Sequence, residues 1–202
     1  MEEGKTISSD RFKMLCTYTK NMTANWEQRS QQYFYPKAFK KTAAIKHGIK
    51  YESLARTAYE DYTGVKVEKI GLVVPEINPW LGYSPDGVTL DENGNPNKLI
   101  EIKCPFADKT KTISDVVQSL NYLNKDLTLK EKNNYFAQIQ LGMAIWNVQI
   151  TDFIIYASVD NSFLILTVEF DREFTNNMLK SLKNVYYNVM LHHICIKEKF
   201  AE

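Results

Sequence analysis

The residues of this sequence whose types and spacing suit chemistry are two carboxylates and a lysine: Asp86, Glu101 and Lys103. Glu101 and Lys103 lie two positions apart in an apolar run typical of a β-strand, so both side chains are expected on one face of that strand. An isolated Glu-x-Lys pair is most often a surface ion pair that contributes little energy. The pair therefore indicates a reactive site only when a further group joins it.

Asp86 is the candidate for that further group. It lies in the Ser-Pro-Asp-Gly segment that begins at Ser84, and the turn-forming cluster at 91–97 predicts a hairpin that brings Asp86 back to Glu101. Taken alone, Asp86 has the alternative interpretation of an ordinary turn residue. Two carboxylates brought together repel each other unless a cation lies between them, and hard oxygen ligands favour Mg²⁺ or Mn²⁺ over zinc.

A divalent cation at such a pair suits the hydrolysis of phosphodiesters. The ion polarises a phosphate oxygen, stabilises charge in the transition state and lowers the pKa of a bound water. Lys103 would orient that water or balance charge. The residues thus predict a metal-dependent phosphodiesterase site.

The elements that position these residues follow from hydrophobic periodicity and turn signals. A helix is expected from Lys37 to Tyr62, ended by Thr63 and Gly64. The predicted strands are Val65 to Val74, a short one through Leu90, Leu99 to Cys104, Ile150 to Ser158 and Ser162 to Phe170, and Trp80 to Tyr83 leads into the segment that begins at Ser84. The other predicted helices are one capped by Ser114 or Asp115 that carries Val116, Val117, Leu120 and Leu123, one from Tyr135 to Trp146, and one with Met178, Leu182, Val185 and Val189. This order predicts one α/β domain over residues 1–202, with a mixed central sheet flanked by helices.

Composition sets further bounds. With 44% hydrophobic and 24% charged residues, the chain has the composition of an ordinary globular protein. The three widely spaced cysteines and three histidines form no zinc signature. No apolar stretch is long enough for a membrane span, and the polar N-terminus lacks the pattern of a secretory signal. We expect a protein that works inside a cell where DNA is present, in a bacterial cytoplasm or in the nucleus or cytoplasm of a eukaryotic cell. The net charge of +1 neither supports nor excludes binding to nucleic acid.

A resemblance to a known family appears at these motifs. The Ser-Pro-Asp-Gly segment at Ser84, a short spacer and the Ile-Glu-Ile-Lys-Cys-Pro-Phe segment at Ile100 resemble the core of phage lambda-type exonucleases and YqaJ-like viral recombinases, within the PD-(D/E)xK nuclease superfamily. The resemblance extends to Tyr51 to Arg56 and to Tyr135 to Gln140, and so covers residues 42–160. It implies a restriction-endonuclease-like core.

The resemblance also implies roles for individual residues. Asp86, Glu101 and the backbone carbonyl of Ile102 would bind Mg²⁺ or Mn²⁺, and Lys103 would position or activate the attacking water. Two more site positions match, Glu52 and Gln138. Glu52 lies on the apolar side of its helix, where an unpaired carboxylate is costly, although a helix-surface glutamate is the alternative. Gln138 can hold a water or a phosphate oxygen, or be a buried amide bonded to backbone.

Candidate DNA contacts are basic and hydroxyl side chains near these motifs. By the resemblance, residues 7–10 correspond to the family's N-terminal segment, which commonly carries an arginine and helps receive a 5′ phosphate. No arginine precedes these residues here, and Arg11 is one candidate for its role. The candidates are Ser8, Ser9, Arg11, Lys46, Ser84 and Lys109, with Lys37, Lys40, Lys41, Lys50 and Lys111 as further basic residues. A solvated lysine surface without a partner is the alternative.

Together, these features predict a metal-dependent deoxyribonuclease, a 5′-to-3′ exonuclease on double-stranded ends that acts in recombination or repair. An endonuclease with the same site and a catalytically inactive DNA-binding paralogue are the alternatives. By resemblance, the expected partners are double-stranded DNA ends, a single-strand annealing protein and two further copies in a ring-shaped homotrimer.

Overall fold

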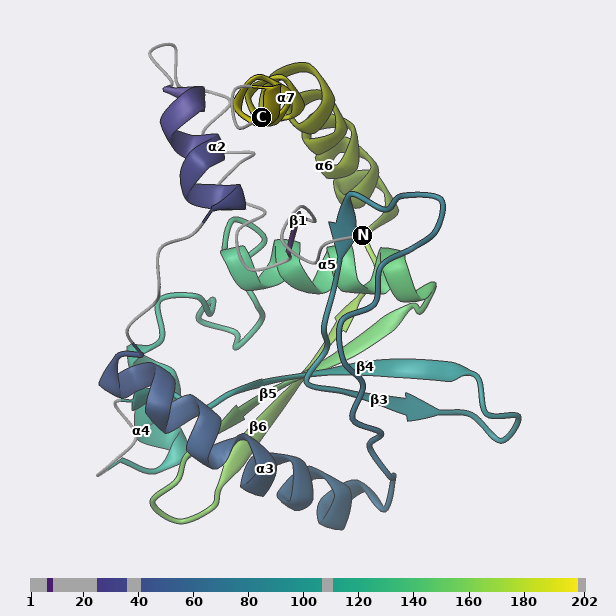
Figure 1. The fold of residues 1–202 in the computed structure, drawn as a ribbon. Coiled ribbons are helices and arrows are strands. Elements are labelled where there is room, and N and C mark those ends of the chain that lie inside the picture. Colours follow the sequence, from purple (N-terminus) through teal and green to yellow (C-terminus); the bar gives the residue numbers. More distant parts are fainter. Residues whose placement is uncertain (1–6, 9–24, 36–40, 107–110, 200–202) are drawn as a thin grey trace.

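The computed structural model describes residues 7–8, 25–35, 41–106 and 111–199, which form a mixed α/β fold (Figure 1). Four strands form the central sheet in the order β3-β4-β5-β6, with β4 and β5 parallel and the other two pairs antiparallel. Helix α3 covers one face of this sheet and α5 the other (Figure 1). The predicted mixed sheet with flanking helices is confirmed.

The elements follow in an order close to the predicted one. Their bounds are β1 (Ile7–Ser8), α2 (Trp26–Phe34), α3 (Ala43–Thr63), β2 (Leu81–Gly82), β3 (Gly87–Leu90), β4 (Pro96–Lys103), α4 (Ile113–Ser119), α5 (Asn134–Trp146), β5 (Ile150–Tyr156), β6 (Phe163–Glu169), α6 (Arg172–Val185), the π-helical turn η3 (Tyr186–Met190) and α7 (Leu191–Lys199). No helix in the described ranges is both long and apolar enough to cross a membrane.

The β3–β4 hairpin forms as predicted. Its register pairs Gly87 with Ile100, which places the residue before Gly87 across from Glu101. The Asp91 carboxylate closes the turn by accepting hydrogen bonds from the backbone N–H groups of Asn93 and Asn95 at 2.9 and 2.8 Å. The predicted turn at 91–97 is two residues too long, because β4 already begins at Pro96.

Alternate side chains of β4 pack into two different hydrophobic clusters, one on each face of the sheet. Ile100 and Ile102 pack with Ala55 and Tyr59 of α3, whereas Leu99 packs in the cluster that includes α5. Period-two alternation therefore sends the side chains of Glu101 and Lys103 toward the α5 side. The shared face predicted for this pair is confirmed.

Helix α3 is shorter at its start than predicted. Thr42 caps it by accepting a hydrogen bond from the Ile45 N–H at 3.3 Å, and Gly64 ends it in the left-handed conformation at φ 70°. Thr63 and Gly64 were the predicted stop. Residues 37–40 of the prediction lie outside the described residues.

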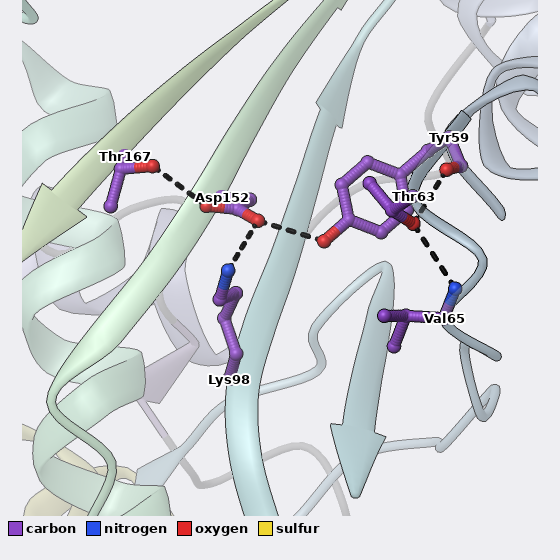
Figure 2. A network of polar contacts seen from close by, with 6 residues as sticks. All are labelled: Tyr59, Thr63, Val65, Lys98, Asp152 and Thr167. Atoms are coloured by element: carbon purple, nitrogen blue, oxygen red, sulfur yellow. Dashed lines mark hydrogen bonds and ion pairs between the residues drawn. The ribbon is translucent and has the colours of Figure 1, made fainter.

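A buried polar network fixes α3 to the sheet (Figure 2). The Asp152 carboxylate of β5 accepts hydrogen bonds from the Tyr59 hydroxyl at 2.7 Å, from the Lys98 ammonium at 2.8 Å and from the Thr167 hydroxyl at 3.0 Å. Burial, followed by the neighbouring Asp152 carboxylate, raises the pKa of the Tyr59 hydroxyl, so this group stays a donor. The network therefore joins one helix and three strands through one carboxylate.

The strand predicted from Val65 to Val74 is wrong. In the structure this segment makes only two isolated bridges, Glu68 with Val88 and Val73 with Tyr83. Its β-branched residues favour extended backbone, yet a ladder also needs a continuous partner, and β3 is only four residues long. Within the segment from Trp80 to Tyr83, the structure contains the short strand β2, which pairs in parallel with β1.

Two helical predictions also change, and one helix had not been predicted. Helix α4 is capped by Thr112 with Asp115 in a capping box, so it begins before the predicted cap and ends at Ser119, short of the apolar residues at 120 and 123. Helix α2 was not predicted. In the last helix, the π-helical turn adds a residue to the periodicity, so Met190 is buried where Val189 was expected.

Candidate active site

Glu101 is the buried centre of the candidate site. Its side chain is 2% exposed and all its described partners are donors. Oε2 accepts the Tyr83 hydroxyl at 2.9 Å, while Oε1 accepts both the Gln138 amide at 2.9 Å and the Lys103 ammonium at 2.5 Å. A buried carboxylate is tolerated only when it is paired in this manner. The hairpin and helix α5 thus hold one negative charge in a fixed orientation.

Asp86 lies beside Glu101, at the bend that leads into β3. Its Oδ2 accepts the Ile102 backbone N–H at 2.6 Å, which ties the bend to the end of β4. No described residue donates a hydrogen bond to its other oxygen, Oδ1, and the side chain lines a pocket of about 600 Å³. Asp86 is therefore the carboxylate of the pair that is open to a ligand.

Glu52 approaches the same pocket from helix α3. Arg56 donates a 2.6 Å hydrogen bond to Glu52 Oε1 and a 2.9 Å hydrogen bond to the backbone carbonyl of Asp86. One guanidinium thereby links the helix to the bend. Glu52 is neutralised by Arg56 in this arrangement, and its role as a further site carboxylate stays a prediction.

The negative charges of Asp86 and Glu101 repel each other, and Lys103 offsets this repulsion only in part. Burial, followed by the charge of Glu101, raises the pKa of Asp86 to about 7, although Lys103 and the Ile102 N–H oppose this rise. Burial alone would lower the pKa of Lys103, but the charges of Glu101 and Asp86 outweigh it and raise the pKa above its usual value. Lys103 therefore stays charged, and the site favours one more positive charge.

The pocket is walled by helix α3, the end of β4 and two tyrosines. Beyond the groups named above, its lining consists of Ala44, Ile45, Gly48, Ile49, Lys103, Cys104, Pro105, Phe106, Tyr122 and Tyr135. The lining therefore combines the charged side chains of Glu52, Asp86 and Lys103 with apolar side chains such as Ile45, Ile49 and Phe106. A ligand with an anionic part and an apolar part fits this combination.

The donor set fits a hard divalent cation. The described ranges hold no cluster of three or more His, Cys, Asp or Glu side chains able to bind a metal, so the candidate ligands here are a pair of carboxylates and backbone oxygen. Two carboxylates and a backbone carbonyl are the ligands with which Mg²⁺ keeps several waters. The raised pKa of Asp86 is the observation that favours such an ion, because a cation would remove the repulsion between the carboxylates.

The candidate DNA contacts are only partly described. Ser84 and Lys46 are exposed, as are Lys41, Lys50 and Lys111. β1 pairs the backbone of Ser8 with Gly82, which precedes Ser84 by two residues. Ser9, Arg11, Lys37, Lys40 and Lys109 lie outside the described residues.

The sequence reasoning missed several residues that shape the site. Arg56 had a usable signal, because it lies four positions after Glu52 on one helix. Tyr83 and Tyr122 had no such signal in the sequence, because each contacts side chains that belong to other elements of the fold. Tyr135 was noted only as part of a motif, yet its ring lies 4.8 Å from the Lys103 ammonium.

The close contact between Gly142 and Tyr83 gives a testable expectation. A Cβ at Gly142 of α5 would lie 2.5 Å from the Tyr83 ring. Gly142→Ala is therefore expected to lower the free energy of unfolding by roughly 1–3 kcal/mol, measured by urea denaturation. Gly48→Ala is the matched control, because nothing lies within 4 Å of its added Cβ and alanine favours a helix. Equal stability of the two variants would contradict the packing described here.

Solved structures with a similar fold are nucleases. The alkaline exonuclease LHK-Exo from Laribacter hongkongensis is 22% identical with a TM-score of 0.70, covering 100% of this chain and 98% of that chain. Its complex with dAMP gives 23% identity, a TM-score of 0.70 and coverage of 98% and 94%. A phage-related exonuclease from Haemophilus somnus 129PT is 12% identical with a TM-score of 0.63, covering 96% of each chain.

These similarities show the fold, which is the restriction-endonuclease-like α/β fold of lambda-type exonucleases, as predicted. A search of curated proteins gave no match. The YqaJ-like viral recombinase domain model matches residues 3–153, and the chain belongs to that family.

Proposed function

We propose that this protein is a metal-dependent deoxyribonuclease that degrades double-stranded DNA from its ends in the 5′-to-3′ direction, in recombination or repair. The observation that carries the proposal is the pair Asp86 and Glu101 at the hairpin, with Lys103 bonded to Glu101 and with Asp86 and Lys103 lining the pocket. Membership of the YqaJ-like family supports DNA as the substrate. The similar alkaline exonucleases, one of them a dAMP complex, support attack at an end.

Each site residue has a defined task in this proposal. Asp86, Glu101 and the Ile102 carbonyl would hold Mg²⁺ or Mn²⁺, which supplies electrophilic activation of the phosphate and a more acidic water. Tyr83 and Gln138 fix the orientation of Glu101 through their two hydrogen bonds. Lys103 keeps its proton and would donate a hydrogen bond to the attacking water or a phosphate oxygen.

The phosphate backbone is proposed to approach from the helix α3 side of the pocket. Lys46 of α3 and Ser84 are exposed and would contact phosphates, which gives binding that weakens as salt concentration rises. The apolar side chains of Ile45, Ile49 and Phe106 would face the terminal nucleotide. These contacts position an end and do not read base sequence.

The direct test is a time course of digestion with Mg²⁺ or Mn²⁺. Linear duplexes carry a label at the 5′ or 3′ end and either a 5′-phosphate or a 5′-hydroxyl, and closed circular DNA is the control. We expect release of mononucleotides from the 5′ ends, no cutting of circles and no activity with EDTA. Cutting of circles as fast as linear DNA would make the protein an endonuclease, and the absence of any hydrolysis would support a DNA-binding role.

Lys103→Ala tests the assignment of the site. Loss of the ammonium that serves the water or phosphate is expected to lower the rate by about 10² to 10³-fold. Lys66→Ala is the matched control, because Lys66 is exposed and pairs only with Glu68 among the described residues. A Lys103→Ala protein with full activity would overturn the site assignment while leaving nuclease activity itself intact.

A further inference from the structure

Lys103 occupies the position that a cation would need at Glu101. Oε1 of Glu101 already accepts two hydrogen bonds, from Lys103 and Gln138, and Oε2 accepts one from Tyr83. The Lys103 ammonium lies 2.5 Å from Oε1, so a divalent ion that bonded the same oxygen would be a close neighbour of the ammonium, and the two positive charges would repel each other. The ammonium therefore has to move when the ion binds.

An aromatic cluster lies where the ammonium can go. The Lys103 ammonium is already 4.8 Å from the Tyr135 ring centroid, a distance at which the ring face attracts a cation. The Tyr122 ring stands perpendicular to Tyr135 with centroids 5.0 Å apart, and Phe153 supports both rings at 6.0 and 5.7 Å. The three rings pack together in edge and tilted contacts that fix the position of each.

Tyr122 brings an unpaired polar group to this cluster. Its side chain is 8% exposed, and its hydroxyl is buried without a hydrogen-bond partner in the part of the chain that the structure describes. Such a group is rare in folded proteins and calls for an explanation. Burial raises the pKa of this hydroxyl, so it stays neutral, and its oxygen can accept a hydrogen bond from an ammonium.

We propose that Tyr122 and Tyr135 are positioning residues for Lys103. When a divalent cation takes the carboxylate of Glu101, the ammonium stays over the Tyr135 ring and donates a hydrogen bond to the Tyr122 hydroxyl, at the edge of the pocket that it shares with Asp86. The inference rests on the proposed function. It explains why a buried hydroxyl has no partner when Lys103 is bound to Glu101.

The test is Tyr122→Phe, which keeps the ring and removes only the hydroxyl. Binding of Ca²⁺ and Mg²⁺ is measured by titration calorimetry, and thermal unfolding is followed with EDTA and with each ion. We expect the affinity for either ion to fall by about 10- to 100-fold, because a hydrogen bond to a charged group is lost only in the ion-bound state. The unfolding temperature in EDTA should not fall.

Tyr59→Phe is the matched control. Its hydroxyl is buried and paired with Asp152 on the other face of the sheet, so the variant should unfold at a lower temperature in EDTA and keep its ion affinity. For Tyr135, phenylalanine keeps the ring face and should retain the ion affinity, whereas leucine should not. Retention by Tyr135→Leu would show that the ring face plays no part.

The outcomes separate this inference from the proposed function. Wild-type protein that hydrolyses DNA while Tyr122→Phe binds ions equally well would overturn the inference alone. A lower unfolding temperature of Tyr122→Phe in EDTA would also overturn it, because the hydroxyl would then be paired before the ion binds. Wild-type protein that neither binds the ions nor hydrolyses DNA would remove the proposed function, and the inference with it.

Discussion

Asp86→Asn is expected to abolish DNA hydrolysis and at the same time to stabilise the metal-free protein. The neutral amide cannot serve as an anionic ligand, so the rate should fall at least about 10³-fold. Its oxygen can still accept the hydrogen bond from the Ile102 N–H, so the hairpin is kept. What disappears is the charge that burial and Glu101 disfavour.

The pH dependence of stability follows from the raised pKa of Asp86. The pKa is about 7 in the folded protein against 3.8 for the free side chain. Below about pH 4 the Asp86 carboxyl is protonated in both the folded and the unfolded protein, so it does not lower the free energy of unfolding. As pH rises to 7 the unfolded chain ionises first, so the stability of the metal-free protein falls, by at most roughly 4 kcal/mol for about three pKa units. Above pH 7 the carboxyl is ionised in both states, so the free energy of unfolding falls no further.

Urea denaturation in EDTA at pH 5 and pH 8 measures this effect. We expect Asp86→Asn to be more stable than wild type at pH 8 and to show a much smaller change between the two pH values. Asp61→Asn, at an exposed position near the end of α3, should follow wild type. Ion binding needs the ionised carboxylate, so nuclease activity of the wild type should rise through pH 7. An Asp86→Asn protein less stable than wild type at pH 8 would contradict the repulsion described here.

Asp152→Ala is expected to lower the free energy of unfolding by about 3–5 kcal/mol, because it leaves the Lys98 ammonium and the Tyr59 hydroxyl without their buried partner. The measurement is urea denaturation. Helix α3 would lose its polar anchor on the sheet (Figure 2). At a temperature where the variant is still folded, its nuclease activity should be close to that of wild type, because the network lies on the sheet face opposite Glu101.

A double variant separates the loss of a partner from the value of the ion pair. Lys98→Met combined with Asp152→Leu removes both charges, and such replacements are often neutral or stabilising. The double variant should therefore be more stable than Asp152→Ala. If it is instead the less stable of the two, the packing of Asp152 rather than its charge pairing anchors α3.

The local parts of the fold were predictable from the sequence. The hairpin depends on turn residues at its tip, and α5 depends on an unbroken apolar pattern, so both followed from neighbouring residues. The Val65 to Val74 segment has the composition of a strand, but whether it pairs is decided by β3, a separate element. The local pattern of residues 65–74 therefore indicated extended backbone, but the prediction that this segment pairs as a strand was wrong.

The charged residues of the site were predictable, and the groups that hold them were not. Asp86, Glu101 and Lys103 were named from their types and spacing, the uncharged Gln138 was named from the family resemblance, and the structure brings them together. The hydroxyl of Tyr83 reaches Glu101 from a segment eighteen positions earlier, and nothing in the tyrosine itself marks that contact. Hydrogen bonds across elements depend on packing, which a single sequence does not display.

The double pairing of β4 determines where this protein tolerates a change in length. Its register is fixed on one edge by β3 and on the other by β5, so the position of Glu101 does not depend on the hairpin tip. The tip at Asp91 to Asn95 is exposed and bonded mainly to itself. Residues inserted there, such as a tag or a tether, would lengthen the loop and leave Asp86 opposite Glu101. One residue inserted within β4 would send Glu101 or Lys103 to the opposite face of the sheet.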